Sequence, residues 1–276
     1  MILDKNHDAA MNDFLLYLRY ISVSFKSQMQ YKVYFWLQVI GQFLGTTVGF
    51  FGVWALFTRF NNIGLWTLNE VALFYGIVNI SFACADALGK GFDSFTTIIK
   101  SGDFDRLLLR PRTTALQLLG KEFTLKQIGR LLQGIVIMWW SLSSLHIPLT
   151  LKNLWLLGAS FLGGVALFVG IVIMQATITF WTIESLEIMN ILTYGGVETA
   201  QYPLAIYSKW FQRFFTFLIP LACVSYFPLL AVLEKENVFL VPLWFCYISP
   251  IAGILFLMVA LKLWKIGEQY YCSTGS

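Results

Sequence analysis

The sequence predicts an all-α polytopic membrane protein with six transmembrane helices, an N-terminal amphipathic interfacial helix and a charged cytoplasmic loop. Of its 276 residues, 58% are hydrophobic and 12% are charged, whereas a soluble domain carries about 25% charged residues. This composition leaves too little polar surface to cover a water-soluble globule, so the solvent of the chain is a lipid bilayer. The length fits one membrane domain, residues 1–276, without a second soluble domain.

The first residues predict a helix that lies along the membrane. Over 11–33, apolar residues recur every three or four positions, while Arg19, Lys26 and Lys32 occupy the other side. A basic amphipathic helix ahead of a spanning segment lies in the membrane interface, and bracing of a cytoplasmic partner is the sharper alternative. Acidic residues interrupt the start of the chain, so we expect no cleavable signal there.

Apolar stretches predict the six crossings, because about 20 apolar residues cross the hydrocarbon core of a bilayer. The predicted spans are 34–58, 69–88, 127–147, 154–180, 183–201 and 238–262. The first span carries Gly41, Gly45 and Gly49, spaced four apart, which form a smooth ridge for close helix packing. The ridge serves either packing within the chain or a seam between subunits.

The fifth crossing is ambiguous, because 214–233 is also uncharged and long enough to span. In one topology this stretch is itself the fifth span. In the other, 183–201 is the fifth span and 202–233 dips into the membrane as short helices hinged at Pro220 and Pro228. Irregular backbone at membrane depth is tolerated only where protein buries it or where it lines a cavity, so such a pair would belong to a conduit.

Basic residues are distributed unevenly between the predicted loops. The N-terminal region, the loop 89–130 and the end of the last span carry four, eight and two of the 19 Lys and Arg residues. By the positive-inside rule these segments face the cytoplasm, together with the tail 263–276. Within the loop, Gly102 and Pro111 bound a charged stretch in which an acidic residue can cap one apolar turn, which predicts a short helix.

The polar residues give no catalytic, cofactor-binding or metal-ligating site. No phosphate-binding GxxxxGK[ST] loop occurs, and the two histidines lie far from each other and from any cysteine. Asn79, Glu184 and Glu187 are candidate polar residues of a pathway, although a solvated pair at the membrane edge is the simpler interpretation of the two glutamates. Asp86, one turn from Lys90, is expected to reach headgroup water. A chain that moves solute uphill would therefore need a partner or an ion gradient.

Three motifs carry a family resemblance. They are Gly102-Asp103-Phe104-Asp105-Arg106-Leu107-Leu108-Leu109-Arg110-Pro111, the series Tyr202-Pro203, Pro220 and Tyr226-Phe227-Pro228, and the ending Tyr271-Cys272-Ser273-Thr274-Gly275-Ser276. With them the chain resembles a permease subunit of the ABC-2 class of ATP-binding-cassette exporters. It is most similar to a bacterial family of uncharacterised permeases that occur as two different permease subunits with one ATPase subunit.

The resemblance implies a role for the loop 89–112, which we call the coupling segment. Its coupling helix, from Gly91 to Leu108, would dock as a rigid body on an ATPase subunit, with phenylalanine rings in a pocket of that subunit and charged residues orienting the contact. The implied contact residues are Phe92, Asp93, Phe95, Lys100, Gly102, Asp103, Phe104, Asp105, Arg106, Arg110 and Pro111. The N-terminal helix would be the connecting helix at the membrane edge.

The resemblance also favours the topology with outer re-entrant helices, which would close the exit. The implied exit-gate residues are Tyr202, Pro203, Pro220 and Pro228. The glutamates 184 and 187 would then lie at the cytoplasmic start of the fifth helix. Gly41, Gly45 and Gly49 would pack one permease against another.

The implied function is that of a transmembrane permease subunit of an exporter in the bacterial cytoplasmic (inner) membrane, with both termini in the cytoplasm. ATP and Mg would bind the partner ATPase subunits and not this chain. The other partners would be a second permease subunit, membrane lipid and an unidentified exported substrate, with no nucleic acid. Two alternatives remain: an ion-coupled secondary transporter or channel, which would transport by itself, and a non-transporting immunity or sensor subunit of the same fold.

Overall fold

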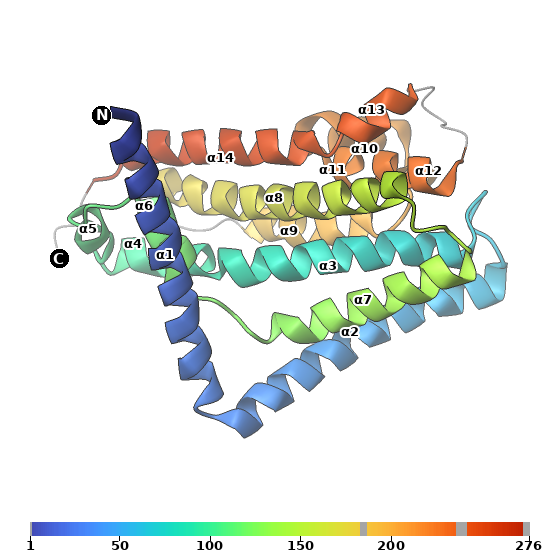
Figure 1. Cartoon of the computed structure of the whole chain (residues 1–276), viewed down its shortest axis with the longest axis horizontal. Coiled ribbons are helices and arrows are strands. Elements are labelled where there is room, and N and C mark those ends of the chain that lie inside the picture. The colour runs from blue at the N-terminus through green and yellow to red at the C-terminus, as the bar shows by residue number, and fades with distance from the viewer. Residues whose placement is uncertain (1, 183–186, 236–241, 273–276) are drawn as a thin grey trace.

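The computed structural model describes residues 2–182, 187–235 and 242–272. Four of its helices form the centre of a bundle and run side by side (Figure 1). They are α3 (Leu68–Asp93), α7 (Gln127–Ser144), α8 (Leu151–Thr182) and α14 (Ile251–Gln269). The predicted all-α class agrees with the described residues, in which the only β pairing is an isolated bridge between Ile63 and Trp66.

Three helical stretches are long and apolar enough to cross a membrane within the described ranges. They are α2 (Lys32–Phe60), the stretch Leu68–Lys100 that joins α3 and α4 (Phe95–Lys100), and α8. The other three predicted spans are helical too, but α7 has 18 residues with Arg130 inside it, α9 (Glu187–Ala200) has 14, and α14 carries charges in its last turns. Six crossings therefore stay a prediction.

The predicted last span, 238–262, is wrong as a single helix. Its first residues lie outside the described ranges, and the rest divides into α13 (Leu243–Ile248) and α14. The break falls at Ser249 and Pro250, and Pro250 takes the N-cap position of α14. Proline has no backbone N–H and is favoured where a helix begins, so a proline within this apolar run restarts the helix.

The stretch 204–233 is a series of short helices. They are η1 (Leu204–Ile206), α10 (Lys209–Arg213), the π-helical η2 (Phe214–Leu218), α11 (Leu221–Val224) and α12 (Tyr226–Leu233). The axis bends by 74° between Lys209–Leu218 and Leu221–Leu233, so a straight fifth span over 214–233 is wrong. The bend falls at Pro220, one of the two predicted hinges, and α10 to α12 gather at the end of the bundle far from both termini (Figure 1).

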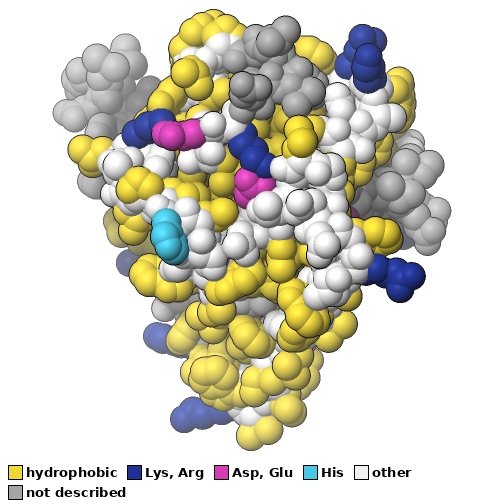
Figure 2. Space-filling model, turned by 90° about the vertical axis from the view of Figure 1, so that its right-hand side faces the viewer, with side chains coloured by type: hydrophobic (Ala, Val, Ile, Leu, Met, Phe, Trp, Pro, Cys, Tyr) yellow, Lys and Arg dark blue, Asp and Glu magenta, His cyan; other side chains and the backbone are white. Residues whose placement is uncertain are grey.

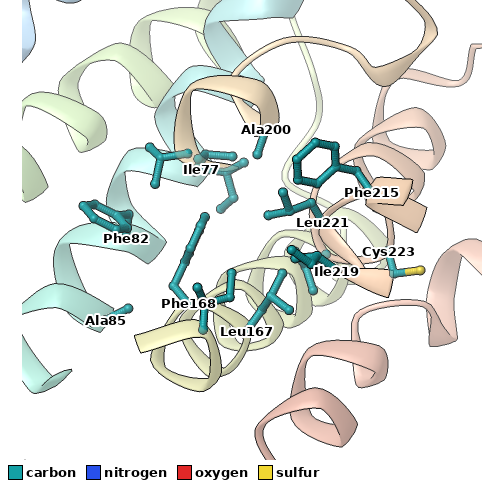
Figure 3. Packing of buried hydrophobic residues seen from close by; sticks show 14 of the residues in the cluster. Ile77, Phe82, Ala85, Leu167, Phe168, Ala200, Phe215, Ile219, Leu221 and Cys223 are labelled. Atoms are coloured by element: carbon teal, nitrogen blue, oxygen red, sulfur yellow. The ribbon is translucent and has the colours of Figure 1, made fainter. Parts of the chain in front are cut away.

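The core is built around α8, which packs against α3 on one side and α14 on the other. Leu167 and Phe168 of α8 lie among buried apolar side chains of α3 and α11, including Ile77, Phe82 and Leu221 (Figure 3). Where α14 begins, its backbone touches that of α8. A Cβ atom on Gly253 would overlap the carbonyl oxygen of Gly163, so this contact requires glycine.

The two ends of the bundle differ in what they hold. One end carries the N-terminus, the described end of the chain, α4, α5 (Phe104–Leu108) and α6 (Thr114–Lys121) (Figure 1). The other end, shown in Figure 2, carries scattered charged side chains among hydrophobic and uncharged ones. There Lys235 pairs with Glu70 at 2.7 Å and lies 4.3 Å from the centroid of the Trp66 ring, so this pair joins the end of α12 to the start of α3.

The N-terminal helix α1 (Ile2–Met29) is longer than predicted and crosses the bundle at a steep angle (Figure 1). Gln28 holds its C-terminal end, because this side chain bonds the carbonyl oxygen of Phe123 and accepts from the backbone N–H of Leu125 at 3.0 Å. Leu18 and Phe25 are exposed on α1, as expected of a helix that meets lipid or a partner along one side.

Candidate functional site: the coupling segment and the polar face of α3

The coupling segment is not one rigid helix from Gly91 to Leu108, as the resemblance implied. Helix α3 ends at Asp93, α4 ends at Lys100, and α5 spans Phe104–Leu108. Gly102 connects the last two with a positive φ of 73°, a backbone conformation that glycine adopts without strain. The predicted short helix within 102–111 is therefore present as α5 and ends before Pro111.

Asp103 does not cap α5 in the predicted way. Its backbone is helical and its side chain makes no capping hydrogen bond. The carboxylate instead accepts from the Ser101 hydroxyl at 2.9 Å and pairs with Arg106 at 3.5 Å. Asp103 thus orients an exposed arginine on the outer side of the segment.

Phe92, Phe95 and Phe104 point into the chain's own core. Their exposed fractions are 2%, 0% and 0%, so the prediction that they fill a pocket of a partner is wrong for this conformation. They form an aromatic cluster with rings from the ends of α8 and α14. Its members are Phe92, Phe95, Phe104, Phe180, Trp264 and Tyr271, with centroid distances from 4.7 Å (Phe95 to Trp264) to 5.5 Å (Phe104 to Phe180) between packed neighbours.

Trp264 is the centre of the aromatic cluster and is 1% exposed. Its indole N–H donates to the Thr114 hydroxyl at 2.9 Å and to the Glu268 carboxylate at 2.8 Å. Thr114 also donates to this carboxylate, so three polar side chains join α14 to α6. Burial raises the pKa of Glu268, while the Trp264 hydrogen bond and the charge of Lys265 lower it.

The exposed surface of the coupling segment carries both charged and apolar side chains. Leu109 is 86% exposed and Leu108 is 46% exposed, and the side chains of Arg106 and Asp103 are 79% and 56% exposed. Of the other predicted contact residues, Asp93, Lys100, Arg110 and Pro111 are exposed, while Gly102 and Asp105 are partly buried. The segment therefore offers leucines, and not phenylalanines, to a partner.

The glycine ridge of α2 is unused within the chain along most of its length. A Cβ atom on Gly41 or Gly45 would meet nothing within 4 Å, and one on Gly49 would lie 3.3 Å from the Tyr75 hydroxyl. Packing within the chain, one of the two interpretations of this ridge, thus holds only near Gly49. Large apolar side chains of α2, such as Leu44 and Phe51, are exposed as well.

Asn79 lies fully buried near the middle of α3. Its side-chain oxygen accepts a 2.8 Å hydrogen bond from Nε of Arg130, and its amide group donates to the backbone of Tyr75. The Arg130 guanidinium lies 4.6 Å from the centroid of the Phe82 ring. Arg130 falls both at the end of the loop 89–130 and inside the predicted span 127–147, and sequence reasoning did not single it out, although its place within a predicted span could have indicated an intramembrane charge.

The other polar residues of α3 are placed differently from the expectation. Asp86 is buried, and the amide of Gln127 donates to its carboxylate, so the expectation of an exposed group in headgroup water is wrong. Lys90 pairs with Asp93 at 2.8 Å. Glu184 lies outside the described residues, and so does the side chain of Glu187, the first residue of α9.

The predicted exit-gate residues lie in the bent region. Pro203, Pro220 and Pro228 are buried, and Tyr202 is partly buried. The motif Ser273 to Ser276 falls outside the described residues, whereas Tyr271 just before it joins the aromatic cluster. Over the described ranges no group of three His, Cys, Asp or Glu residues could hold a metal ion.

The comparisons with known proteins identify a family. The family described as ABC-2 family transporter protein matches residues 43–275. This range includes the whole coupling segment, the polar face of α3 and every described helix after α2. No curated protein and no solved structure gives a match. Because the match covers most of the chain, the chain belongs to the ABC-2 family of transporter proteins.

Proposed function

We propose that this chain is one of two permease subunits of an exporter whose separate ATPase subunits drive it through the coupling segment. The observation that carries the proposal is the aromatic cluster, which fixes this segment to the ends of two long helices, α8 and α14. A segment fixed in this way moves as one body with those helices. The family membership supplies the need for a partner that hydrolyses ATP.

The proposed coupling contact lies on the exposed side of the segment. Leu108 and Leu109 would enter an apolar pocket of an ATPase subunit, while Arg106 and Asp103 orient the contact. The buried rings behind them would pass the movement to the membrane helices. Coupling of this type needs packed elements with two arrangements that both subunits can bias.

The second permease would pack on the glycine ridge of α2. A Cβ atom on Gly41 or Gly45 would meet none of the described residues within 4 Å, and small residues allow helices to approach closely inside a membrane. We infer that the two permeases are different chains and that the path for the substrate runs along their interface, between the faces that carry α2, α3 and α9. Both termini and the coupling segment share one end of the bundle (Figure 1), which is consistent with a cytoplasmic position in a bacterial membrane.

Leu109→Asp is expected to abolish the stimulation of the ATPase by the permease and to leave the chain's own stability unchanged. The side chain is 86% exposed, so a carboxylate there costs little in the free chain, whereas it would be buried unpaired at an apolar contact. ATP hydrolysis and co-purification of the ATPase with the permease measure the effect.

Leu151→Asp is the matched control for this test. Leu151 is 88% exposed and begins α8, at the opposite end of the bundle. Its substitution should leave ATPase stimulation intact. Equal stimulation in wild type and Leu109→Asp would rule out this surface as the coupling contact.

Gly45→Leu is expected to weaken the association of the two permeases several-fold, because the added side chain would stand where the partner's backbone approaches. The chain itself should fold as before, since nothing lies within 4 Å of the site. Gly158→Leu, on α8 and equally free of neighbours, is the control. Cross-linking of the two permeases in membranes gives the answer, and an unchanged yield for Gly45→Leu would place the seam elsewhere.

A further inference from the structure

Arg130 places a permanent positive charge near the middle of the membrane bundle. Its partner Asn79 is 11 residues from the start of α3, which is about 16 Å at 1.5 Å per residue. That is roughly half of a hydrocarbon core about 30 Å thick. An arginine at this depth is energetically costly, and such residues mark substrate paths.

The charge of Arg130 is left without a carboxylate partner. No Asp or Glu of the described residues lies within ion-pair distance of it, and only Nε makes a hydrogen bond with described groups. A guanidinium has five N–H donors in a planar fork that fits phosphate and carboxylate groups. Four donors are therefore available to a ligand that brings its own negative charge.

Arg130 has aromatic neighbours. Arg130 is partly exposed, and Tyr194 of α9, which is 51% exposed, packs its ring 5.9 Å from Phe82. On the other side, the Tyr75 hydroxyl donates to the Thr46 carbonyl oxygen at 2.8 Å and so joins α3 to α2. The Phe82 ring thus lies against the guanidinium and Tyr194 packs on Phe82, so an apolar body could rest on the exposed Tyr194 ring.

Two acidic groups act on Arg130: the buried Asp86 of α3, whose carboxylate accepts from the Gln127 amide, and Glu198 of α9. Glu198 is exposed and lies in electrostatic range of Arg130 and Tyr75 without forming an ion pair. Both carboxylates reduce the positive potential at Arg130, but neither forms an ion pair with it. The Arg130 guanidinium therefore keeps N–H groups that can donate to an anion, and Asn79 and the ring of Phe82 hold it in place.

We propose that Arg130 binds the anionic group, a phosphate, sulfate or carboxylate, of the compound that this permease exports. Asn79 is a positioning residue, since its oxygen holds Nε and leaves the rest of the guanidinium fork for the ligand. Tyr194, which is exposed beside Phe82, contacts an apolar body attached to that group. The inference rests on the proposed function only in naming the ligand as cargo, and binding itself requires no ATPase.

The test measures binding of dodecyl phosphate to the purified permease complex in a neutral detergent without ATP. Dodecyltrimethylammonium and inorganic phosphate are the comparison ligands. Dodecyl phosphate should bind, the cation should not, and Arg130→Gln should weaken binding about tenfold or more because charge-assisted hydrogen bonds are lost. Arg130→Lys should keep part of the affinity. Arg59→Gln, at the exposed end of α2, removes the same charge elsewhere and should change nothing.

A second variant keeps the arginine and gives its positive charge a partner within the chain. Asn79→Asp places a carboxylate beside the guanidinium, which should form an internal ion pair and weaken dodecyl phosphate binding to a similar degree. This variant decides the matter if Arg130→Gln fails to assemble. Competition by inorganic phosphate would identify a free anion as the ligand, and its absence would identify the head group of an amphiphile.

Two results would overturn the inference: dodecyl phosphate binding that is equal in wild type and Asn79→Asp, or equal binding of the anionic and cationic amphiphiles. Failure of the proposed function looks different. In that case Leu109→Asp leaves ATPase stimulation unchanged while the dependence of anion binding on Arg130 persists.

Discussion

Trp264→Ala is expected to disconnect the coupling segment from the membrane helices. Trp264 is buried among the rings of Phe92, Phe95 and Phe180 at centroid distances of 5.2, 4.7 and 5.0 Å. Truncating a buried aromatic side chain to alanine lowers the free energy of unfolding by about 3–5 kcal/mol. Part of the bundle end should therefore loosen, and ATPase stimulation by the permease should be lost even where the complex still assembles.

Two further variants separate packing from hydrogen bonding in this prediction. Trp264→Phe keeps a ring and removes the indole N–H, while Thr114 and Glu268 keep their mutual hydrogen bond, so the loss should be about 1 kcal/mol. Trp155→Ala removes a tryptophan that is 64% exposed near the start of α8, far from the aromatic cluster, and should leave coupling intact. The thermal midpoint of the complex and its ATPase rate measure all three. Full stimulation of the ATPase by Trp264→Ala would show that the aromatic cluster is not what couples the segment to the membrane helices.

Gly91→Ala is expected to be the most damaging small substitution within the coupling segment. A Cβ atom there would overlap the backbone carbonyl oxygen of Leu118 in α6, and backbone cannot move aside as a flexible side chain can. Alanine favours a helix over glycine by about 1 kcal/mol, but overpacking of this kind costs about 1–3 kcal/mol or more. Helix α6 should therefore move away from α3, and assembly with the ATPase should fall.

Gly52→Ala is the matched control for Gly91→Ala. Gly52 lies in α2, and a Cβ atom there would meet nothing within 4 Å. Only the gain in helix propensity should remain, so the thermal midpoint should stay the same or rise. A midpoint that falls equally in both variants would mean that the contact between Gly91 and Leu118 is not what makes the first substitution costly.

Apolar runs and the positions of glycine and proline in the sequence were enough to predict some of the helices. The uncharged run that became α2 and the apolar run that became α8 are long enough to fix a helix by themselves. Gly102 and Pro111 bound the short helix α5 for a similar reason, since one permits a positive φ and the other cannot continue a helix. Pro250 carried the same kind of signal, and the break before α14 could have been predicted from it.

Contacts between distant residues were beyond the reach of the sequence. The motif around Phe104 indicated that the segment matters, but it could not show that the ring faces Phe180 and Tyr271 and not a partner. Arg130 and Asn79 are 51 residues apart and Trp264 and Thr114 are 150 apart. Which polar groups pair is decided by how the helices pack, and periodicity shows only which face each helix buries.

The glycine contact between α8 and α14 has a mechanical consequence. The two helices touch at Gly163 and Gly253, and near the other end the Phe180 ring lies against Gly267, so they resist bending as a single stiff lever. Helix α8 has 32 residues, about 48 Å at 1.5 Å per residue. A tilt of about 5° at the aromatic cluster would displace the far end by about 4 Å over that length. That end packs against α11 and α12, so a slight rotation at the aromatic cluster becomes a shift as wide as a side chain at the opposite end of the bundle.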